Sequence, residues 1–184
     1  MRCSAVLLAG GKSSRMGQDK AFLEIGGEQL WRLQMEKLRQ LSPGQIMLSG
    51  PRRNEWKAYE VIPDEVENAG PLAGVAAALT KCGMSHLVVL AIDLPMMTSS
   101  FLRLLLSLCG HNHGAVPRSA NGFEPLAAVY PASCASTANA ALRAGDFSLQ
   151  NFVREAISEK LLVERHISRA EASLFTNLNT PADL

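Results

Sequence analysis

The stretch CSAVLLAGGKSSRMGQDK, residues 3–20, decides the fold and indicates where the chemistry lies. Its first part, Ala5-Val6-Leu7-Leu8-Ala9, is a continuous apolar run of strand length, which is typical of a strand buried on both faces of a parallel sheet. The run stops at Gly10-Gly11, where the missing Cβ atoms permit a tight turn and let backbone N–H groups approach a ligand. The stretch therefore predicts a buried strand followed by a glycine loop.

Positively charged side chains accompany these glycines. Lys12, Arg15 and Lys20 fall in the same short segment, together with Gly17. Cations beside unhindered backbone N–H groups predict a phosphate-binding loop. Neither GxxxxGK[ST] nor GxGxxG can be found here, so the loop belongs to neither of those common nucleotide-binding motifs. The alternative is a glycine-rich turn with solvated charges.

The composition is that of an ordinary globular protein. The chain has 184 residues, 47% hydrophobic and 19% charged, which fits one domain spanning residues 1–184. A formal net charge of +1 gives no basic field that would favour nucleic acid. No apolar run approaches the ~20 residues that span a bilayer, and no secretory segment is expected. Four cysteines without a CxxC pair favour buried free thiols in a reducing cytoplasm.

Strand-like apolar runs alternate with helix-like segments, which predicts an α/β fold with a mostly parallel sheet. Leu87 to Ile92 is the most apolar run and is expected at the centre of the sheet. Other expected strands are 46–48, 59–62, 115–117, 126–130 and 161–163, with a strand-like piece at 173–175; expected helices are 28–40, 70–79, 101–108, 131–144, 148–156 and one beginning at Thr180.

Asp93 follows the expected central strand and precedes Leu94-Pro95. Open parallel sheets bind ligands at the carboxyl ends of their strands, where Asp93, Asp64 and the Gly10 loop all fall. A buried carboxylate is costly unless something neutralises it, and Mg²⁺ prefers one or two carboxylates plus phosphate oxygens. Asp93 is therefore a candidate magnesium ligand. The alternative is a turn in which Asp93 caps backbone N–H groups near Met96.

Three further segments carry two interpretations each. Asp64 suits either a surface turn or a contact with a base or the metal. Gly70-Pro71-Leu72-Ala73-Gly74 begins a helix, whose N–H groups could bind an anion or whose glycines could serve close packing. Asn177 and Asn179 lie on alternate positions, where they could face a polar ring or form a turn before the last helix. Arg52-Arg53 is interpreted as a solvated helix start rather than a phosphate patch.

Four motifs together resemble the MobA-like nucleotidyltransferases, the family related to molybdenum cofactor guanylyltransferase. They are Leu8-Ala9-Gly10-Gly11 with Arg15-Met16-Gly17 and Asp19-Lys20; Gly70-Pro71-Leu72-Ala73-Gly74; Asp93-Leu94-Pro95; and Asn177-Leu178-Asn179-Thr180-Pro181. They stand in the family's order over nearly the whole chain, and GPLAG is more similar to the guanylyl branch than to the cytidylyl branch.

The resemblance implies a three-layer α/β/α, Rossmann-like fold similar to the GT-A nucleotide-diphospho-sugar transferases. It implies GTP bound along Leu8, Ala9, Gly10 and Gly11 and held by Lys20, with Gly74 at the nucleotide site. It further implies Asp64 near the nucleotide, Asp93 on Mg²⁺, and Asn177 and Asn179 toward molybdenum-molybdopterin. Arg15, Lys20 and Asp93 are the implied catalytic residues, and transient contacts with cofactor insertion proteins or apoenzymes are implied as well.

The resemblance also has departures. Ser49 or Gly50 stands where the family often carries asparagine, and the Glu124-Pro125-Leu126-Ala127 segment matches no single substrate. The implied reaction transfers GMP from GTP to molybdenum-molybdopterin with release of pyrophosphate. Its rivals are the same chemistry with CTP or with a sugar or alcohol phosphate, and a non-catalytic cofactor carrier. A carrier has no leaving group to stabilise, so Arg15, Lys20 and Asp93 favour an enzyme.

Overall fold

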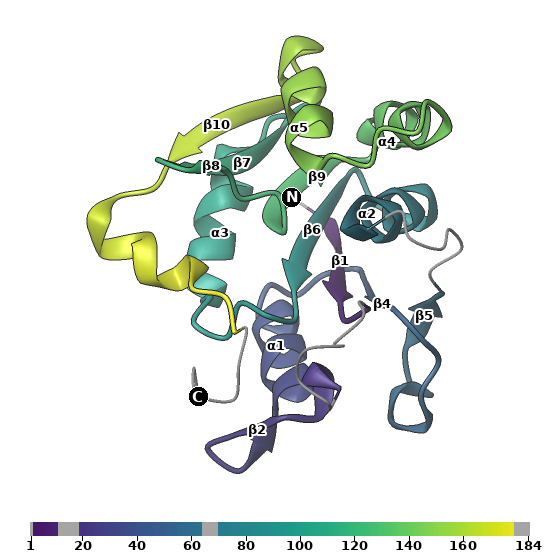
Figure 1. Cartoon of the computed structure of the whole chain (residues 1–184), viewed down its shortest axis with the longest axis vertical. Helices are drawn as coiled ribbons and strands as arrows, with labels where there is room; N and C mark the ends of the chain where they lie inside the picture. Colours follow the sequence, from purple (N-terminus) through teal and green to yellow (C-terminus); the bar gives the residue numbers. More distant parts are fainter. Residues whose placement is uncertain (1, 11–18, 64–69, 179–184) are drawn as a thin grey trace.

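The computed structural model describes residues 2–10, 19–63 and 70–178, and its centre is one mixed β-sheet (Figure 1). Seven strands lie in the order β10-β7-β9-β6-β1-β4-β5, and β8 pairs with β7. The strands are β1 (Cys3–Leu8), β2 (Glu24–Ile25), β3 (Glu28–Gln29), β4 (Gln45–Ser49), β5 (Glu60–Ile62), β6 (His86–Ala91), β7 (Gly114–Ser119), β8 (Gly122–Phe123), β9 (Ala127–Pro131) and β10 (Leu162–His166). The most apolar run, β6, is the middle strand, as the sequence predicts.

The sheet is mostly parallel, again as predicted. β1 pairs parallel with β4 and β6, β4 with β5, and β7 with β10. β9 runs antiparallel between β6 and β7, and the short β8 runs antiparallel beside β7. Because β1, β4, β5 and β6 all point the same way, their carboxyl ends share one edge of the sheet.

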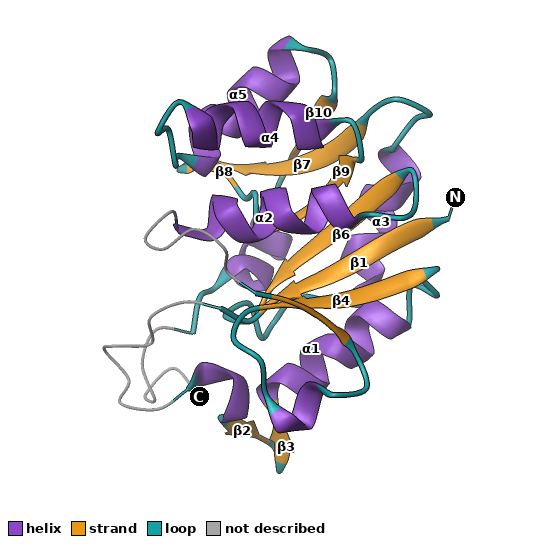
Figure 2. Ribbon diagram, turned by 90° about the vertical axis from the view of Figure 1, so that its right-hand side faces the viewer, coloured by secondary structure: helices purple, strands orange, loops and turns teal. Residues whose placement is uncertain are grey.

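Helices cover both faces of the sheet and complete three layers (Figure 2). One face packs against α1 (Leu30–Arg39) and α3 (Ser99–Leu108), and the other against α2 (Gly70–Lys81), α4 (Cys134–Arg143) and α5 (Leu149–Ser158). Alternate residues of β1 serve the two faces: Ala5 and Leu7 join the first core, Val6 and Leu8 the second. This double burial explains why β1 reads as an unbroken apolar run.

Local signals set the helix boundaries. Thr98 caps α3 by accepting a hydrogen bond from the Phe101 N–H, and Ser148 caps α5 through the Asn151 N–H, which confirms the predicted cap at Ser148. Two predicted helices start too early. Pro131 ends β9 rather than beginning α4, and the Glu28-Gln29 pair forms β3 of a small hairpin with β2 before α1 begins.

The strand-like interpretation of residues 173–175 is wrong. Residues Arg169–Phe175 form a 3-10 helix, η3, and the Glu171 carboxylate accepts hydrogen bonds from the Ser168 N–H at 2.9 Å and the Ser168 hydroxyl at 2.7 Å. Serine followed three residues later by glutamate is a helix-start pattern that outweighs the short apolar run. The helix expected from Thr180 lies outside the described residues.

The four cysteines are free thiols. Cys3 and Cys134 are buried, while Cys82 and Cys109 are partly exposed, so the expectation of buried thiols holds for two of them. Among the described residues, no helix combines the length and the apolar character needed to cross a membrane.

Candidate active site

The candidate site lies where β1, β4, β5 and β6 end. Backbone hydrogen bonds continue one residue past these strands: the Ala9 N–H donates to the Ser49 carbonyl at 2.8 Å, and the Ile92 N–H donates to the Leu8 carbonyl at 3.0 Å. The Gly50 N–H likewise donates to the Ile62 carbonyl at 2.9 Å. The loops that follow these strands therefore start side by side at one edge, as expected for a ligand site of an open sheet.

Glycine allows the backbones to approach closely at this edge. A Cβ on Gly50, whose φ is +147°, would lie 2.9 Å from the Gly10 nitrogen. A Cβ on Gly74 would lie 2.8 Å from Ser49 Oγ and 3.4 Å from Leu8 Cδ2. Gly74 thus allows α2 to pack closely against β1 and β4. This contact agrees with the interpretation that the glycines of the GPLAG motif serve close packing. Gly10, by contrast, is exposed at the end of β1.

Leu178 joins two predicted site residues that are far apart in the sequence. Its N–H donates to the Asp93 carbonyl at 2.8 Å, and its carbonyl accepts from Lys20 Nζ at 2.7 Å. Lys20, Asp93 and the Asn177-Leu178 segment thus meet at the carboxyl edge. Asn177 itself is exposed, directly before the buried Leu178.

The Asp93 carboxyl group is electrostatically unusual. Burial raises the pKa of Asp93 above its ordinary value, and the positive charge of Lys20 acts in the opposite direction. Removal from water disfavours the carboxylate, so a cation placed here would be bound partly by relieving that penalty. Desolvation and a specific charge partner together are typical of functional carboxylates, although structural pairs share them.

Lys20 is placed by its neighbour Asp19. The Asp19 carboxylate accepts a hydrogen bond from the Ala21 N–H at 3.1 Å and caps the 3-10 helix η1 (Lys20–Phe22). The same carboxylate forms an ion pair with Arg53. The Arg53 guanidinium lies 5.6 Å from the Phe22 ring centroid and 6.0 Å from that of Trp56. Arg53 therefore fixes η1 from the β4–β5 connection.

The interpretation of Arg52-Arg53 as a solvated helix start is thus half right. A short 3-10 helix, η2 (Asn54–Trp56), does follow, and Arg52 is exposed. Arg53 is partly buried, however, and the two arginines border a groove of about 710 Å³ that Trp56 and Tyr59 also line. Sequence reasoning missed the Arg53 contact with Asp19 because nothing in the local pattern predicts it.

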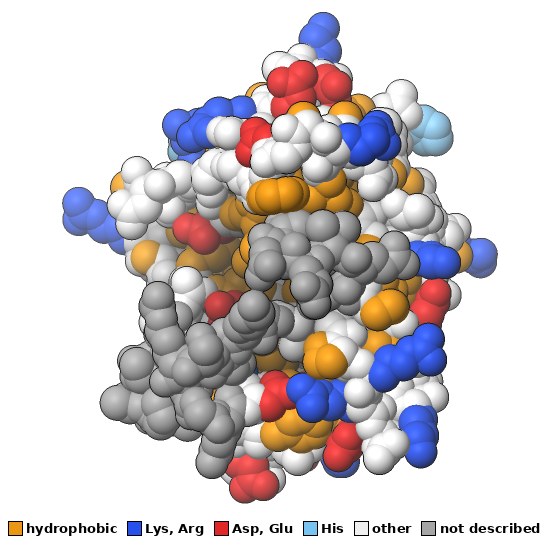
Figure 3. Space-filling model, turned by 45° about the vertical axis from the view of Figure 1, so that its right-hand side comes forward, with side chains coloured by type: hydrophobic (Ala, Val, Ile, Leu, Met, Phe, Trp, Pro, Cys, Tyr) orange, Lys and Arg blue, Asp and Glu red, His pale blue; other side chains and the backbone are white. Residues whose placement is uncertain are grey.

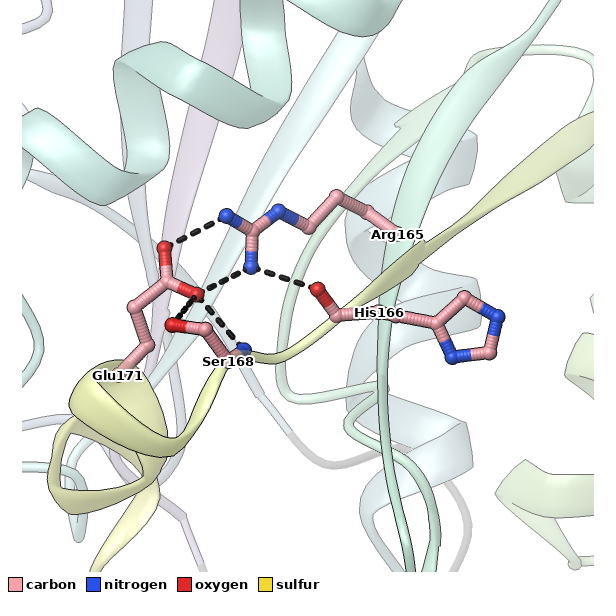
Figure 4. A network of polar contacts seen from close by, with 4 residues as sticks. All are labelled: Arg165, His166, Ser168 and Glu171. Atoms are coloured by element: carbon pink, nitrogen blue, oxygen red, sulfur yellow. Dashed lines mark hydrogen bonds and ion pairs between the residues drawn. The ribbon is translucent and has the colours of Figure 1, made fainter.

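The C-terminal segment that leads to Leu178 is anchored to β10, the strand at the other end of the sheet from β5, by a polar network (Figure 4). Arg165 on β10 donates two hydrogen bonds to Glu171 on η3, at 2.5 and 2.6 Å. Hydrogen bonds from Arg165 and Ser168 lower the pKa of Glu171 to about 2. The Phe175 ring packs edge-on against Phe101 of α3, with centroids 5.3 Å apart. These contacts fix η3 just before the segment that reaches Lys20 and Asp93.

Several predicted site residues lie outside the described part of the chain. They are Gly11, Arg15, Asp64 and Asn179. The other predicted site residues belong to the carboxyl edge of the sheet or to segments that contact it. They are Leu8, Ala9, Gly10, Lys20, Gly74, Asp93 and Asn177. Figure 3 shows acidic side chains lying beside hydrophobic ones on this face of the molecule.

The described side chains could hold Mg²⁺ only if a substrate supplied some of the ligands. Within residues 2–10, 19–63 and 70–178, no group of three or more His, Cys, Asp or Glu side chains could hold a metal ion. Mg²⁺ often binds to one or two carboxylates and completes its shell with water and phosphate oxygens. The partly buried Asp93 carboxyl group suits that arrangement, and the described residues do not form an all-protein cage.

A family model described as the MobA-like NTP transferase domain matches residues 5–166. The probable molybdenum cofactor guanylyltransferase of Opitutus terrae is 38% identical, over 98% of this chain and 92% of that protein. The molybdenum cofactor guanylyltransferase of Rhizobium meliloti is 33% identical, over 98% and 88% of the two chains.

Solved structures agree with this match. Molybdopterin-guanine dinucleotide biosynthesis protein A from Archaeoglobus fulgidus superimposes with a TM-score of 0.74 at 27% identity, over 98% of this chain and 94% of that one. The 2-C-methyl-D-erythritol 4-phosphate cytidylyltransferase of Thermus thermophilus has a TM-score of 0.70 at 14% identity, over 97% and 93%, and shares the fold alone. The class defined by the fold and its carboxyl edge is that of the α/β nucleotidyltransferases. Within that class, the chain belongs to the family of MobA-like NTP transferases.

Proposed function

We propose that the protein transfers GMP from GTP to molybdenum-molybdopterin, forming the molybdopterin guanine dinucleotide cofactor and releasing pyrophosphate. The relatives named molybdenum cofactor guanylyltransferase support this choice of nucleotide and acceptor. The structural observation that carries the proposal is the meeting of Lys20, Asp93 and Leu178 at the carboxyl edge of the sheet.

The proposed reaction is a displacement at the α-phosphorus of GTP. An oxygen of the molybdopterin phosphate forms the new bond to phosphorus, and the bond to the bridging oxygen of pyrophosphate breaks with its electron pair leaving on pyrophosphate. The attacking phosphate is already anionic, so no side chain has to remove a proton. Catalysis of this kind depends on positioning and on charge stabilisation.

Lys20 is the described cation proposed to stabilise the developing negative charge. Its ammonium group donates to the Leu178 carbonyl, which fixes its position and leaves further N–H donors for phosphate oxygens. We propose that Arg15, Gly10 and Gly11 contribute to the same phosphates, and that Asp64 contacts the nucleotide. Leu8 and Ala9 lie at the base of this loop, and Asn177 and Asn179 are proposed to face the pterin.

Asp93 is the residue proposed to hold Mg²⁺ together with the substrate phosphates. A bound Mg²⁺ would supply Lewis-acid polarisation of the phosphoryl group and charge neutralisation. The protein's own contribution is to present a desolvated carboxylate whose backbone is fixed, close to the Lys20 charge. We further propose a cytoplasmic enzyme that passes its product to cofactor insertion proteins or apoenzymes.

The test is pyrophosphate release with each of GTP, CTP, ATP and UTP, in the presence of Mg²⁺ and molybdenum-loaded molybdopterin. We expect GTP to exceed CTP by ~10²-fold or more in kcat/KM, because base recognition through buried hydrogen bonds discriminates strongly. Mass spectrometry should identify the guanine dinucleotide product. Preference for CTP would replace the guanylyl assignment by a cytidylyl one, and tight GTP binding without pyrophosphate release would indicate a carrier.

A further inference from the structure

We propose that Gln34 and Lys37, on one face of α1, are positioning residues that hold the loop bearing Asp93 in place through its backbone carbonyl groups. The Asp93 loop is defined as residues 92–97, directly after β6. This inference rests on the proposed function, since it assigns the loop's rigidity to the presentation of Asp93. The two side chains are three residues apart, so they point to the same side of the helix.

Gln34 spans the end of β6 with a single amide group. Its Nε2 lies 2.8 Å from the Leu94 carbonyl oxygen, 3.2 Å from that of Ala91 and 3.4 Å from that of Ile92. The side chain is 0% exposed, so these contacts are shielded from water. Hydrogen bonds in such an interior are stronger than their solvated equivalents.

Lys37 contacts the next carbonyl group of the loop after those that Gln34 contacts. Its Nζ donates to the Pro95 carbonyl at 2.6 Å. Burial of the side chain lowers the pKa of Lys37 to about 8, because removal from water disfavours the charged ammonium group. A lysine that only covered the helix surface would extend its ammonium group into water.

Together these contacts account for every carbonyl from residue 91 to residue 95. The two N–H donors of Gln34 are shared among those of Ala91, Ile92 and Leu94, Lys37 donates to that of Pro95, and the Leu178 N–H donates to that of Asp93. The Leu94 carbonyl also accepts from the Met97 N–H at 3.1 Å, closing a turn. The backbone on both sides of Asp93 is therefore fixed, which restricts where its side chain can lie.

Gln34 is a poor choice if packing were its only role. It occupies the apolar face of α1, between the buried Trp31 and Leu38. Its Oε1 accepts no hydrogen bond from the described residues, and a buried unpaired acceptor destabilises a fold. An apolar side chain would avoid that penalty but could not hold the three carbonyl groups. The position is thus better explained by the loop than by the core.

The first test replaces Gln34 by methionine, which keeps an unbranched side chain and removes the amide. We expect the Mg²⁺ concentration for half-maximal pyrophosphate release to rise by ~10-fold, as for other residues that support a metal ligand. The KM for GTP should stay within about twofold and the loss should fall on kcat, since the substrate contacts are untouched.

A second readout needs no activity. Hydrogen–deuterium exchange of the peptide covering residues 91–97 should become ~10-fold faster in Gln34→Met, because local opening becomes easier without the three contacts. Lys37→Met should give a smaller effect in the same peptide, and it removes no fully buried group, so it remains informative if Gln34→Met folds poorly.

The matched control is Thr137→Val on α4. Thr137 is 8% exposed and its Oγ1 donates to the exposed Glu159 at 2.6 Å, so the variant removes a partly buried hydrogen bond on the opposite face of the sheet. It should lower the melting temperature without changing the Mg²⁺ requirement or exchange at 91–97. If Gln34→Met and Lys37→Met behave like Thr137→Val in both readouts, the positioning role is refuted.

The experiments distinguish failure of the proposed reaction from failure of the positioning role of Gln34 and Lys37. If the wild-type protein released no pyrophosphate from any nucleotide, the proposed function would fail, and the exchange measurement alone would decide the role of Gln34. Faster exchange at 91–97 would then support it, and unchanged exchange would overturn it.

Discussion

An ionisable side chain lies at or near each end of strand β6, and the two side chains have different surroundings. At the amino end, His86 is 0% exposed, with Nδ1 3.0 Å from Ser85 Oγ and Nε2 3.2 Å from the His113 carbonyl oxygen. Just past the carboxyl end, Asp93 is partly buried. Burial lowers the pKa of His86 and raises the pKa of Asp93, so in both cases the neutral form is favoured.

The surroundings of these two side chains differ in kind. The ring nitrogens of His86 contact a hydroxyl and a carbonyl, which satisfy a neutral ring. Asp93 instead lies near the Lys20 charge, and its loop is held by α1 and by Leu178. A perturbed pKa is therefore a weak indicator of a site on its own. Convergence of separate segments around a charge, at the edge where ligands bind, is the stronger one.

The largest expected effect is that of Asp93→Asn. If the carboxylate holds Mg²⁺, turnover should fall by ~10²–10³-fold, in line with the several kcal/mol that a metal ion supplies to a transition state. The stability of the protein should not fall, because a desolvated carboxyl group is replaced by a neutral amide of the same shape. Steady-state kinetics over a Mg²⁺ titration and thermal unfolding measure the two quantities. Wild-type metal dependence would favour the capping interpretation of Asp93.

A somewhat smaller loss is expected from Lys20→Met. Removing one preorganised cation from the phosphates should lower kcat by ~10²-fold, while GTP binding weakens less. Lys81→Met on α2 removes an exposed lysine away from the carboxyl edge and serves as the control. Equal turnover of the two variants would remove Lys20 from the site.

The smallest effect on activity is expected at the other end of β6. His86→Gln should leave turnover within about twofold and lower the free energy of unfolding by about 1–2 kcal/mol, because the buried contacts are imperfectly replaced. The wild-type protein should also lose stability as the pH falls below 6.5, since the unfolded chain then binds a proton that the folded His86 resists. His86→Gln should weaken that pH dependence in chemical denaturation. A large loss of turnover would contradict the distinction between the two ends.

The sequence predicts the fold well where burial on both faces produces unbroken apolar runs, as in β1 and β6. It fails where capping or tertiary contacts compete with composition. Residues 173–175 look like a strand, yet Ser168 and Glu171 set a 3-10 helix before them. Only a pattern of serine followed by glutamate three positions later could have indicated this.

The candidate site divides in the same way. The sequence indicates Asp93 as a candidate because a carboxylate directly after an apolar strand is unusual, and Lys20 because of the motif it closes. Gln34 left one signal, a polar residue on an otherwise apolar helical face. Nothing local could indicate that Leu178 connects Lys20 with Asp93, since that contact exists only once the chain has folded.

The two hydrogen bonds of Leu178 also bear on the order in which the protein can fold during translation. During translation, every described strand leaves the ribosome before residue 178 does, as do Lys20 and Asp93. The strands from β1 to β9 can therefore pair before the carbonyl that fixes Lys20 has left the ribosome. The carboxyl edge of the sheet, where the nucleotide is proposed to bind, is therefore completed last. A chain that folded without residue 178 would lack the contact that fixes Lys20 there.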